Sequence, residues 1–376
     1  MLIKPRAGQA ARIKVVGIGG GGGNAITSMI ADGGITGVEF VAVNTDAQAL
    51  LHNKATIKIQ IGENLTKGLG SGGDPETGRQ AAEESRDRLK EELSGAEMVF
   101  ITCGEGGGTG TGAAPIVAEV AKETGALTVA VVTKPFDFEG TKRRLTADEG
   151  AQKLKEKVDT LIIVPNQKIL AIIDKKTPIL EAFKKIDSVL SQGVKGIAEL
   201  ITAPGLINVD FADVKTVMSN AGTALMGMGI ASGDKRAMAA IKQAVSSPLL
   251  DVSMEGAKGV LFNIVGGPDL TMTEVDEAAS IIAKSVDPDA DIIFGAVIDD
   301  RMMDSIKITL IATKFDENKL KLFRFNKVSQ EEPIKNEEKL KEIEMKETID
   351  EDIPEDTEEF FDDQNEFDIP AFLRKK

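Results

Sequence analysis

The sequence has almost none of the residues on which disulfides and histidine chemistry depend. Its 376 residues include one cysteine, Cys103, and one histidine, His52, with no tryptophan or tyrosine. A single cysteine excludes an internal disulfide framework and is typical of a reducing compartment. One histidine argues against zinc binding and histidine-based catalysis. We therefore expect Cys103 to be a small packed residue at a strand end and His52 to be solvated in a loop.

Long apolar runs and a basic surplus are missing as well. No apolar stretch is long enough to span a bilayer, and residues 1–11 lack the apolar core of a signal peptide. We therefore expect a cytoplasmic protein with no direct membrane insertion. The net charge is −15. Residues 347–368 contribute −12 of it, because they hold 12 acidic side chains and no Lys or Arg, so the rest of the chain carries −3. Without a basic patch, nucleic acid is not an expected partner.

Glycine, by contrast, is concentrated in three turns that each follow a predicted strand. One turn, 103–112, separates a strand at 98–102 from a helix at 113–124. Glycines allow a ligand to approach the main chain, and successive N–H groups in front of a helix bind phosphate oxygens. A mobile linker is the alternative, but linkers rarely lie between a strand and a helix. The candidate phosphate-binding residues in this turn are Gly108, Thr109 and Gly110.

The other two glycine turns follow predicted strands at 12–16 and 57–61, and the second of them precedes a helix predicted at 75–93. In an open parallel sheet all three turns lie at the carboxyl edge, where ligands bind. We therefore expect a chain of phosphates held by backbone amides from several loops. A P-loop is excluded, because no GxxxxGK followed by Ser or Thr occurs. The candidate residues in these turns are Gly20, Gly21, Gly22, Gly23 and Asn24 in the first and Gly70, Gly72 and Gly73 in the second.

A dinucleotide-binding oxidoreductase is the main alternative. Gly17, Gly19 and Gly22 match the GxGxxG pattern, which alone is a weak signal. That fold needs an acidic residue at the end of the second strand to hold a ribose. Here the strand at 38–43 has Glu39 at the wrong end and Asp46 in the following loop. No obvious proton-handling residue for a nicotinamide is present.

A long helix is predicted from Pro178 to Ala203, because apolar residues recur there at intervals of three and four. We interpret it as a buried central helix that joins two domains. Asp187 lies among its core positions, where its carboxylate could accept the N1–H and N2–H donors of guanine. Phe183 fits core packing and ring stacking equally well. The apolar positions are Ile179, Phe183, Ile186, Leu190, Val194, Ile197 and Ile201.

The segment after this helix carries two acids three residues apart, Asp210 and Asp213. Chain position alone favours acids that cap a helix N-terminus. Beyond them, residues 214–316 are predicted to alternate helix and strand, with elements at 234–245, 259–265, 273–283, 292–297 and 305–313. Thr271 and Glu274 are spaced as a capping box before the third of these. No catalytic cluster is visible in that region, and its methionines are expected to fill the core.

The run GGGTGTG at 106–112, together with these motifs, resembles the tubulin/FtsZ family of GTPases from about Ile13 to Thr313 and over the last nine residues. The resemblance implies GTP or GDP as ligand, with Mg²⁺ held mainly by phosphates and water and no metal site built from side chains. It assigns Glu139 and Arg143 to the ribose and phosphates, although chemistry alone is equally satisfied by a surface salt bridge. It also places Asn166, Phe183 and Asp187 at the guanine.

The resemblance further implies that Asn208, Asp210 and Asp213 form a catalytic loop. From Asp187 to Asn208 is 21 residues, or roughly 30 Å of helix. The acids therefore could not reach a nucleotide held by their own chain and would act on that of the next subunit. Such a contact generates a head-to-tail homopolymer. The family role is a cell-division ring at the septum.

The last part of the chain is expected to recruit partners. Residues 317–366 are rich in Glu, Lys and Asp and predict an acidic disordered linker. Residues 367–376 resemble the terminal peptide by which the family binds membrane-tethering division proteins at mid-cell, on the inner face of the membrane. The candidate partner-binding residues are Asp368, Ile369, Pro370, Phe372 and Leu373.

Together these observations predict an α/β fold, a Rossmann-like parallel-sheet GTP-binding domain joined by a long central helix to a smaller α/β domain, with a disordered C-terminal tail. The expected divisions are a flexible N-terminus at 1–11, the GTP-binding domain at 12–177, the helix at 178–204 and the second domain at 205–316. The functional alternatives are the oxidoreductase and a scaffold that binds GTP without hydrolysing it. Light scattering separates them, because only an active polymer should scatter with GTP and decay as GTP is consumed.

Overall fold

The computed structural model describes residues 11–170, 173–174, 176–203, 205–248, 250 and 254–316. The predicted linker at 317–366 lies outside the described residues. So does the predicted partner-binding peptide with Asp368, Ile369, Pro370, Phe372 and Leu373.

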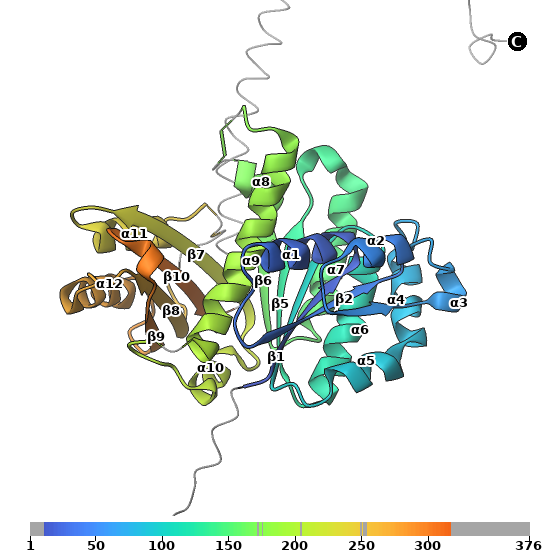
Figure 1. Cartoon of the computed structure of the whole chain (residues 1–376), viewed down its shortest axis with the longest axis horizontal. Coiled ribbons are helices and arrows are strands. Elements are labelled where there is room, and N and C mark those ends of the chain that lie inside the picture. The colour runs from blue at the N-terminus through green and yellow to red at the C-terminus, as the bar shows by residue number, and fades with distance from the viewer. Residues whose placement is uncertain are drawn as a thin grey trace, which may run out of the picture. The chain divides into compact units, whose positions relative to one another are not determined.

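The described chain is built on a ten-stranded sheet in the order β3-β2-β1-β4-β5-β6-β7-β10-β8-β9 (Figure 1). Neighbouring strands from β3 to β7 are parallel, β10 runs antiparallel to both β7 and β8, and β9 is parallel to β8. The predicted α/β fold with a parallel sheet is therefore confirmed. The strands are β1 (Ile13–Ile18), β2 (Val38–Asn44), β3 (Ile57–Gln60), β4 (Met98–Gly104), β5 (Leu127–Lys134), β6 (Thr160–Pro165), β7 (Gly222–Ser232), β8 (Gly259–Gly266), β9 (Asp291–Ile298) and β10 (Ser305–Thr313).

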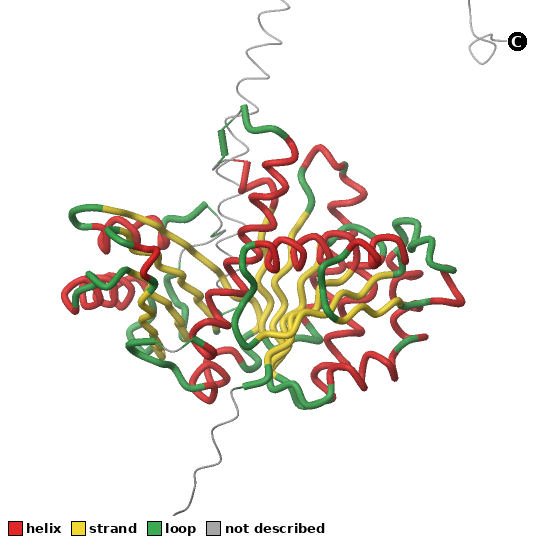
Figure 2. The backbone as a smooth tube through the Cα atoms, viewed as in Figure 1, coloured by secondary structure: helices red, strands yellow, loops and turns green. Residues whose placement is uncertain are grey.

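Helices cover both faces of the parallel part of the sheet, as Figure 2 shows. Strands such as β4 and β5 are nearly continuous apolar runs and are buried, which is typical of parallel strands covered on two sides. One apolar core contains residues of α1, α2, α8, α9 and α10, and a second contains residues of α4 to α7. The helices of this part are α1 (Gly19–Ala31), α2 (Ala47–His52), α3 (Glu63–Thr66), α4 (Pro75–Glu84), α5 (Arg86–Leu93), α6 (Thr109–Glu123), η1 (Asp137–Glu139), α7 (Thr141–Lys155), α8 (Asn166–Leu170), α9 (Ile179–Thr202) and α10 (Phe211–Met218).

The remaining strands, β8 to β10, form a third core with two further helices. These are α11 (Arg236–Val245) and α12 (Met272–Ser285), with the short η2 (Asp300–Met302) before β10. Thr271 and Glu274 form the predicted capping box at the start of α12. Met226 is buried, as expected for a core-filling methionine, but Met272 and Met303 are 69% and 75% exposed, so the prediction is wrong for these two.

The parallel register brings the ends of six strands to one edge of the sheet. Ile18 of β1 lies beside both Val43 and Cys103, and Lys134 of β5 lies beside Pro165. The segments that follow these strands therefore meet at the carboxyl edge. This edge is the point of the fold at which the three glycine turns converge.

Several sequence predictions need correction. The first glycine run is already helical from Gly19, and the predicted helix at 75–93 is two helices that meet at Ser85. Strand β7 was not predicted at all, because glycine and methionine interrupt its pattern. Ile179 and Phe183 are 69% and 44% exposed, so the first turn of α9 does not belong to the core.

Candidate functional site

The first glycine turn combines close packing with an open face. A Cβ atom at Gly22 would overlap the carbonyl oxygen of Thr102, and one at Gly17 would overlap that of Gly22. A Cβ at Gly20 would meet nothing within 4 Å. Glycine at 17 and 22 thus lets α1 lie directly on the sheet, whereas glycine at 20 leaves backbone amides accessible at a helix N-terminus.

The other two glycine turns contact each other. Gly70, Gly72 and Gly73 have positive φ angles and open space at their Cβ positions. A Cβ at Gly108 would overlap Ser71 and approach the backbone of Asp74. The second turn therefore needs glycine for its backbone angles, and the third needs it for close packing. The structure brings the predicted phosphate-binding residues 20–24, 70–73 and 108–110 to one edge of the sheet.

A hydroxyl cluster connects the second and third glycine turns to the loop that follows β2. This cluster was not predicted from the sequence. Thr109 Oγ1 lies 2.7 Å from Thr45 Oγ1 and 3.0 Å from Ser71 Oγ. Thr45 follows β2, Ser71 follows β3 and α3, and Thr109 begins α6. Only the fold could reveal the cluster, since its members are isolated Ser and Thr residues in the sequence.

A pocket of about 170 Å³ opens beside the glycine turns and collects most of the other predicted site residues. It draws side chains from α1, η1, α7, α8 and α9. The lining residues are Gly21, Asn24, Gly104, Glu105, Thr133, Pro135, Glu139, Arg143, Asn166, Phe183, Ile186, Asp187 and Leu190.

Asn166 and Asp187 each bring to this pocket a side-chain acceptor that has no donor among the described residues. Asn166 is 7% exposed, yet its Oδ1 atom makes no hydrogen bond in the described part of the chain. Burial raises the pKa of Asp187 to about 6, because the charged carboxylate loses water without gaining a partner. Buried acceptors without donors are costly. A ligand that presents N–H groups, as guanine does, fits this pair.

Phe183 lies on the same pocket with nearly half of its surface exposed. Its ring meets the edge of Phe136 at a centroid distance of 5.7 Å, and Phe136 stacks on Phe138 at 4.9 Å. Simple core packing, one of the two interpretations of Phe183, is therefore wrong. The aromatic ring is held by Phe136 and remains accessible for stacking.

Glu139 and Arg143 form the salt bridge that their sequence spacing allows. Glu139 Oε2 pairs with Arg143 Nη1 at 2.9 Å, and Glu139 Oε1 accepts from the backbone N–H of Phe136 at 2.8 Å. Both residues also line the pocket. The salt bridge thus holds a carboxylate and a guanidinium at the wall of the pocket.

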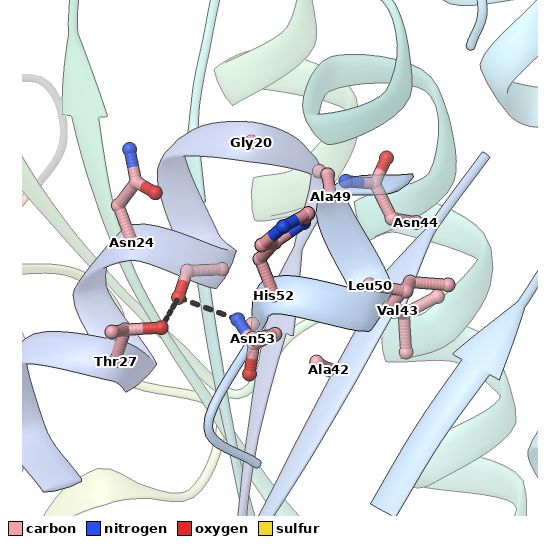
Figure 3. A pocket seen from close by; sticks show the side chains of 13 residues that line it. Gly20, Asn24, Thr27, Ala42, Val43, Asn44, Ala49, Leu50, His52 and Asn53 are labelled. Atoms are coloured by element: carbon pink, nitrogen blue, oxygen red, sulfur yellow. Dashed lines mark hydrogen bonds between the residues drawn. The ribbon is translucent and has the colours of Figure 1, made fainter. Parts of the chain in front are cut away.

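A second pocket, of about 220 Å³, lies between α1 and α2 (Figure 3). Asn53 Nδ2 and Thr27 Oγ1 both donate to the carbonyl oxygen of Gly23, at 2.8 and 3.0 Å. His52 ends α2, is exposed, and has its Nδ1 atom 2.9 Å from Gln48 O, so its predicted position in a loop is wrong. These contacts hold the carbonyl group of Gly23 in the first glycine turn.

The structure does not bring Asn208, Asp210 and Asp213 to either pocket. They are exposed and lie beyond the C-terminal end of α9, while Asp187 lies near its start (Figure 1). The helix from Asp187 to Thr202 alone spans about 22 Å. Asp210 caps α10 by accepting from the N–H groups of Ala212 and Asp213, at 2.6 and 3.2 Å, so the capping prediction is confirmed.

The described residues contain neither a membrane-spanning helix nor a cluster of metal ligands. None of their helices is both long and apolar enough to cross a bilayer. Within the same residues, no group of three or more His, Cys, Asp or Glu side chains is arranged to hold a metal ion.

Comparisons with known proteins agree with this geometry. Residues 12–174 match the GTPase domain of the Tubulin/FtsZ family, and residues 222–316 match the C-terminal domain of the FtsZ family. An empty FtsZ dimer from M. jannaschii is 49% identical, with a TM-score of 0.78 and coverage of 82% of this chain and 89% of that one. A mutant FtsZ from the same organism is 50% identical, with a TM-score of 0.78 and coverage of 81% and 91%.

A more distant structure shows the same fold. CetZ2 from Haloferax volcanii is 21% identical, with a TM-score of 0.69 and coverage of 85% of this chain and 99% of that one. The oxidoreductase alternative is wrong, because the domain that carries the GxGxxG pattern matches the GTPase domain of the Tubulin/FtsZ family. The chain belongs to the tubulin/FtsZ family and is a GTPase of the FtsZ type.

Proposed function

We propose that this GTPase assembles head to tail into protofilaments and hydrolyses GTP at the junction between subunits. The observation that carries the proposal is the separation of the pocket from the acids along α9. A nucleotide at the carboxyl edge cannot be reached by Asp210 and Asp213 of the same chain. The relatives include an FtsZ dimer and a CetZ2 protofilament with bound GTPγS, which supports assembly as a property of this fold.

In this proposal the guanine lies in the pocket near Phe183, with Asn166 Oδ1 and the ionised Asp187 accepting its N–H donors. Glu139 and Arg143 hold the ribose and an adjacent phosphate. The backbone amides of 20–24, 70–73 and 108–110 hold the phosphate chain. The unpaired acceptors and the open glycine faces support this placement.

Mg²⁺ fits the proposed site as a companion of the nucleotide. Mg²⁺ keeps several waters and is commonly bound through substrate phosphates with one or two carboxylates. When bound, it would neutralise charge on the β- and γ-phosphates. The described residues offer no carboxylate cluster for it, so the phosphates and water would be its main ligands.

The acids would act by positioning and electrostatics. Asp210 holds the first turn of α10 through its cap, which fixes where Asp213 is presented. Asn208 Oδ1 accepts from the N–H of Gly205 at 2.7 Å and fixes the loop before it. A rigid loop with two carboxylates can orient and polarise the attacking water of a neighbouring subunit's GTP.

Exposed apolar side chains at both ends are suited to such a junction. Leu69 and Phe138, on the loops beside the proposed nucleotide site, are 86% and 69% exposed. Leu206, near the acids, is 68% exposed and its N–H donates to Ala296 O of β9. Two different surfaces that complement each other form a heterologous contact, which propagates into an open filament.

A mixing experiment tests catalysis in trans. Asp213→Ala keeps the pocket and loses one acid, whereas Asp187→Ala keeps the acids and loses a guanine contact. Each variant alone should hydrolyse GTP slowly, and an equimolar mixture should recover activity at mixed junctions. The control mixes Asp213→Ala with the double variant Asp187→Ala/Asp213→Ala, which should recover none. If the first mixture is no more active than its components, the acids do not act across a junction.

The dependence of rate on concentration gives a second test. A site completed only by a neighbour should show almost no GTPase activity below a threshold protein concentration. Full activity per molecule in a monomeric sample would contradict the proposal.

We further propose that the filaments form the cell-division ring at the septum, in the cytoplasm beneath the membrane, where the terminal peptide at 367–376 binds membrane-tethering proteins. The FtsZ-type domains support this role, and the sequence of the peptide supports the attachment. A fluorescent fusion should form mid-cell rings, and deletion of 367–376 should abolish the rings while leaving assembly in solution intact. Rings that persist without the peptide would contradict the attachment.

A further inference from the structure

Glu105 is a buried acid in the glycine loop 104–110 that the proposed mechanism does not use. It is 2% exposed and lies three residues before Gly108. Its backbone N–H donates to Thr133 O at 2.8 Å, which ties the loop to β5. The side chain lines the pocket that holds Asn166 and Asp187.

The two carboxyl oxygens of Glu105 are in different surroundings. Oε1 accepts a weak hydrogen bond from Cys103 Sγ at 3.5 Å, while Oε2 has no partner among the described residues. A Cβ atom at Gly150 of α7 would overlap Oε2, so glycine there makes room for the carboxyl group. Thr111 Oγ1 accepts from the Gly106 N–H at 2.8 Å. The Thr111 hydroxyl group also lies near the Glu105 side chain and lowers its pKa, though by less than burial raises it. The acid is thus built into the loop.

No cation compensates this acid within the described part of the chain. Lys134 of β5 favours the charged form from a distance, but its ammonium group pairs with Asp148 at 2.6 Å. Arg143 of α7, whose carbonyl packs at Gly106, pairs with Glu139. Burial raises the pKa of the Cys103 thiol, so β4 contributes a neutral donor. Burial likewise raises the pKa of Glu105 to about 7.

We propose that Glu105 takes up a proton when the phosphates of a guanine nucleotide bind to the loop, so that the neutral carboxyl group is the nucleotide-binding form. The proton comes from the buffer acid and is bound by the carboxyl group, and no other bond changes. This inference rests on the proposed placement of the phosphates at 108–110.

The direction follows from charge. Bound phosphates add negative charge near a carboxylate that is already poorly solvated, which raises its pKa further. By linkage, nucleotide binding then weakens as the pH rises through the pKa of the free protein. If the bound nucleotide raises the pKa by one unit, about half a proton is taken up per nucleotide at pH 7.5. The dissociation constant then rises about fourfold between pH 7 and pH 8.5.

The test is calorimetric titration of the full chain with GDP at pH 7.5, in buffers of different ionisation enthalpy. The comparison variant is Glu105→Gln, which resembles the protonated acid. The phosphate titrates in both proteins, so the difference between them reports Glu105. Asp187, with a pKa of about 6, is already ionised at this pH. We expect the wild type to take up about half a proton more than Glu105→Gln at pH 7.5 and to lose about fourfold more affinity between pH 7 and pH 8.5.

Equal proton uptake by the two proteins would overturn the inference and leave the GTPase function intact. Failure of either protein to bind GDP at any pH would instead overturn the proposed phosphate placement. Should Glu105→Gln not fold, infrared difference spectra of the wild type with ¹³C-labelled glutamate decide the matter. A protonated carboxyl band that appears on GDP addition supports the proposal, and its absence refutes it.

Discussion

Replacing Asp187 with asparagine should change stability and nucleotide affinity in opposite directions. Burial raises the pKa of this carboxyl group from 3.8 to about 6. Because the folded-state pKa lies above the unfolded value, the ionised form is disfavoured in the fold. That cost is fully present above pH 6 and declines as the pH falls from the folded-state pKa of about 6 toward the unfolded value of 3.8. Asparagine is isosteric and uncharged, so Asp187→Asn removes the cost.

The size of the effect follows from the shift. About two pKa units correspond to roughly 2.7 kcal/mol for a group shielded from water. Asp187 is only half-buried, so solvent screening reduces this to about 1 kcal/mol. The nucleotide-free variant should therefore melt about 2 °C higher than the wild type at pH 7, and at about the same temperature at pH 4.

GDP binding should respond the other way. A hydrogen bond to a charged group contributes about 1.5–3 kcal/mol, so losing the carboxylate should weaken GDP binding roughly 10- to 150-fold. Thermal unfolding with and without GDP at pH 7 and pH 4 measures both effects, and Asp276→Asn, at an exposed position of α12, is the matched control. A nucleotide-free Asp187→Asn protein that melts lower at pH 7, or one that GDP stabilises as much as the wild type, would refute the reasoning.

Three further predictions concern the glycine loops and the ends of the molecule. Gly108→Ala should destabilise the fold by about 1–3 kcal/mol, because the added Cβ would overlap Ser71 and Asp74. Gly20→Ala should keep the melting temperature of the wild type yet bind GDP at least about tenfold more weakly. Equal melting temperatures of the two variants would contradict this. Ser71→Ala removes the 3.0 Å hydrogen bond between Ser71 Oγ and Thr109 Oγ1, which contributes about 1 kcal/mol, and should lower kcat about fivefold in assembled protein. An unchanged kcat would show that the hydroxyl cluster is only structural. Leu69→Ala should raise the critical concentration for GTP-dependent light scattering severalfold without changing GDP affinity, while Ile230→Ala, an exposed change on β7, should not.

The part of the fold that the sequence predicts best is the repeated strand, glycine turn and helix of the first half. Apolar runs such as Met98–Thr102 leave little choice but a buried strand, and glycines after them mark the turns. The carboxyl edge then follows from the geometry of parallel sheets. The exposed Phe183 shows the limit, since helical periodicity cannot distinguish a core position from one that faces a pocket.

Strand β7 was missed because it contains glycines that are required for packing against a helix, and local strand propensity does not reflect that requirement. Cβ atoms at Gly227 and Gly229 would overlap the carbonyl oxygens of Ala244 and Ala240. Helix α11 thus lies directly against the strand, and only glycine permits that approach. The partners of Thr109 were missed for a related reason, since contacts between Thr45, Ser71 and Thr109 exist only after three loops have been brought to one edge.

The two ends of α9 differ in a way that bears on how the site is completed. At the pocket end, Asn166 and Asp187 hold acceptors that the described part of the chain does not satisfy. Such groups lower the stability of the empty protein, and a ligand that binds only the folded state restores it. At the other end, Asn208 and Asp210 are exposed and satisfied by their own loop. In the proposed arrangement, a bound nucleotide would therefore complete the pocket of one subunit, whereas the acids keep their conformation without a ligand and would act on the nucleotide of a neighbour.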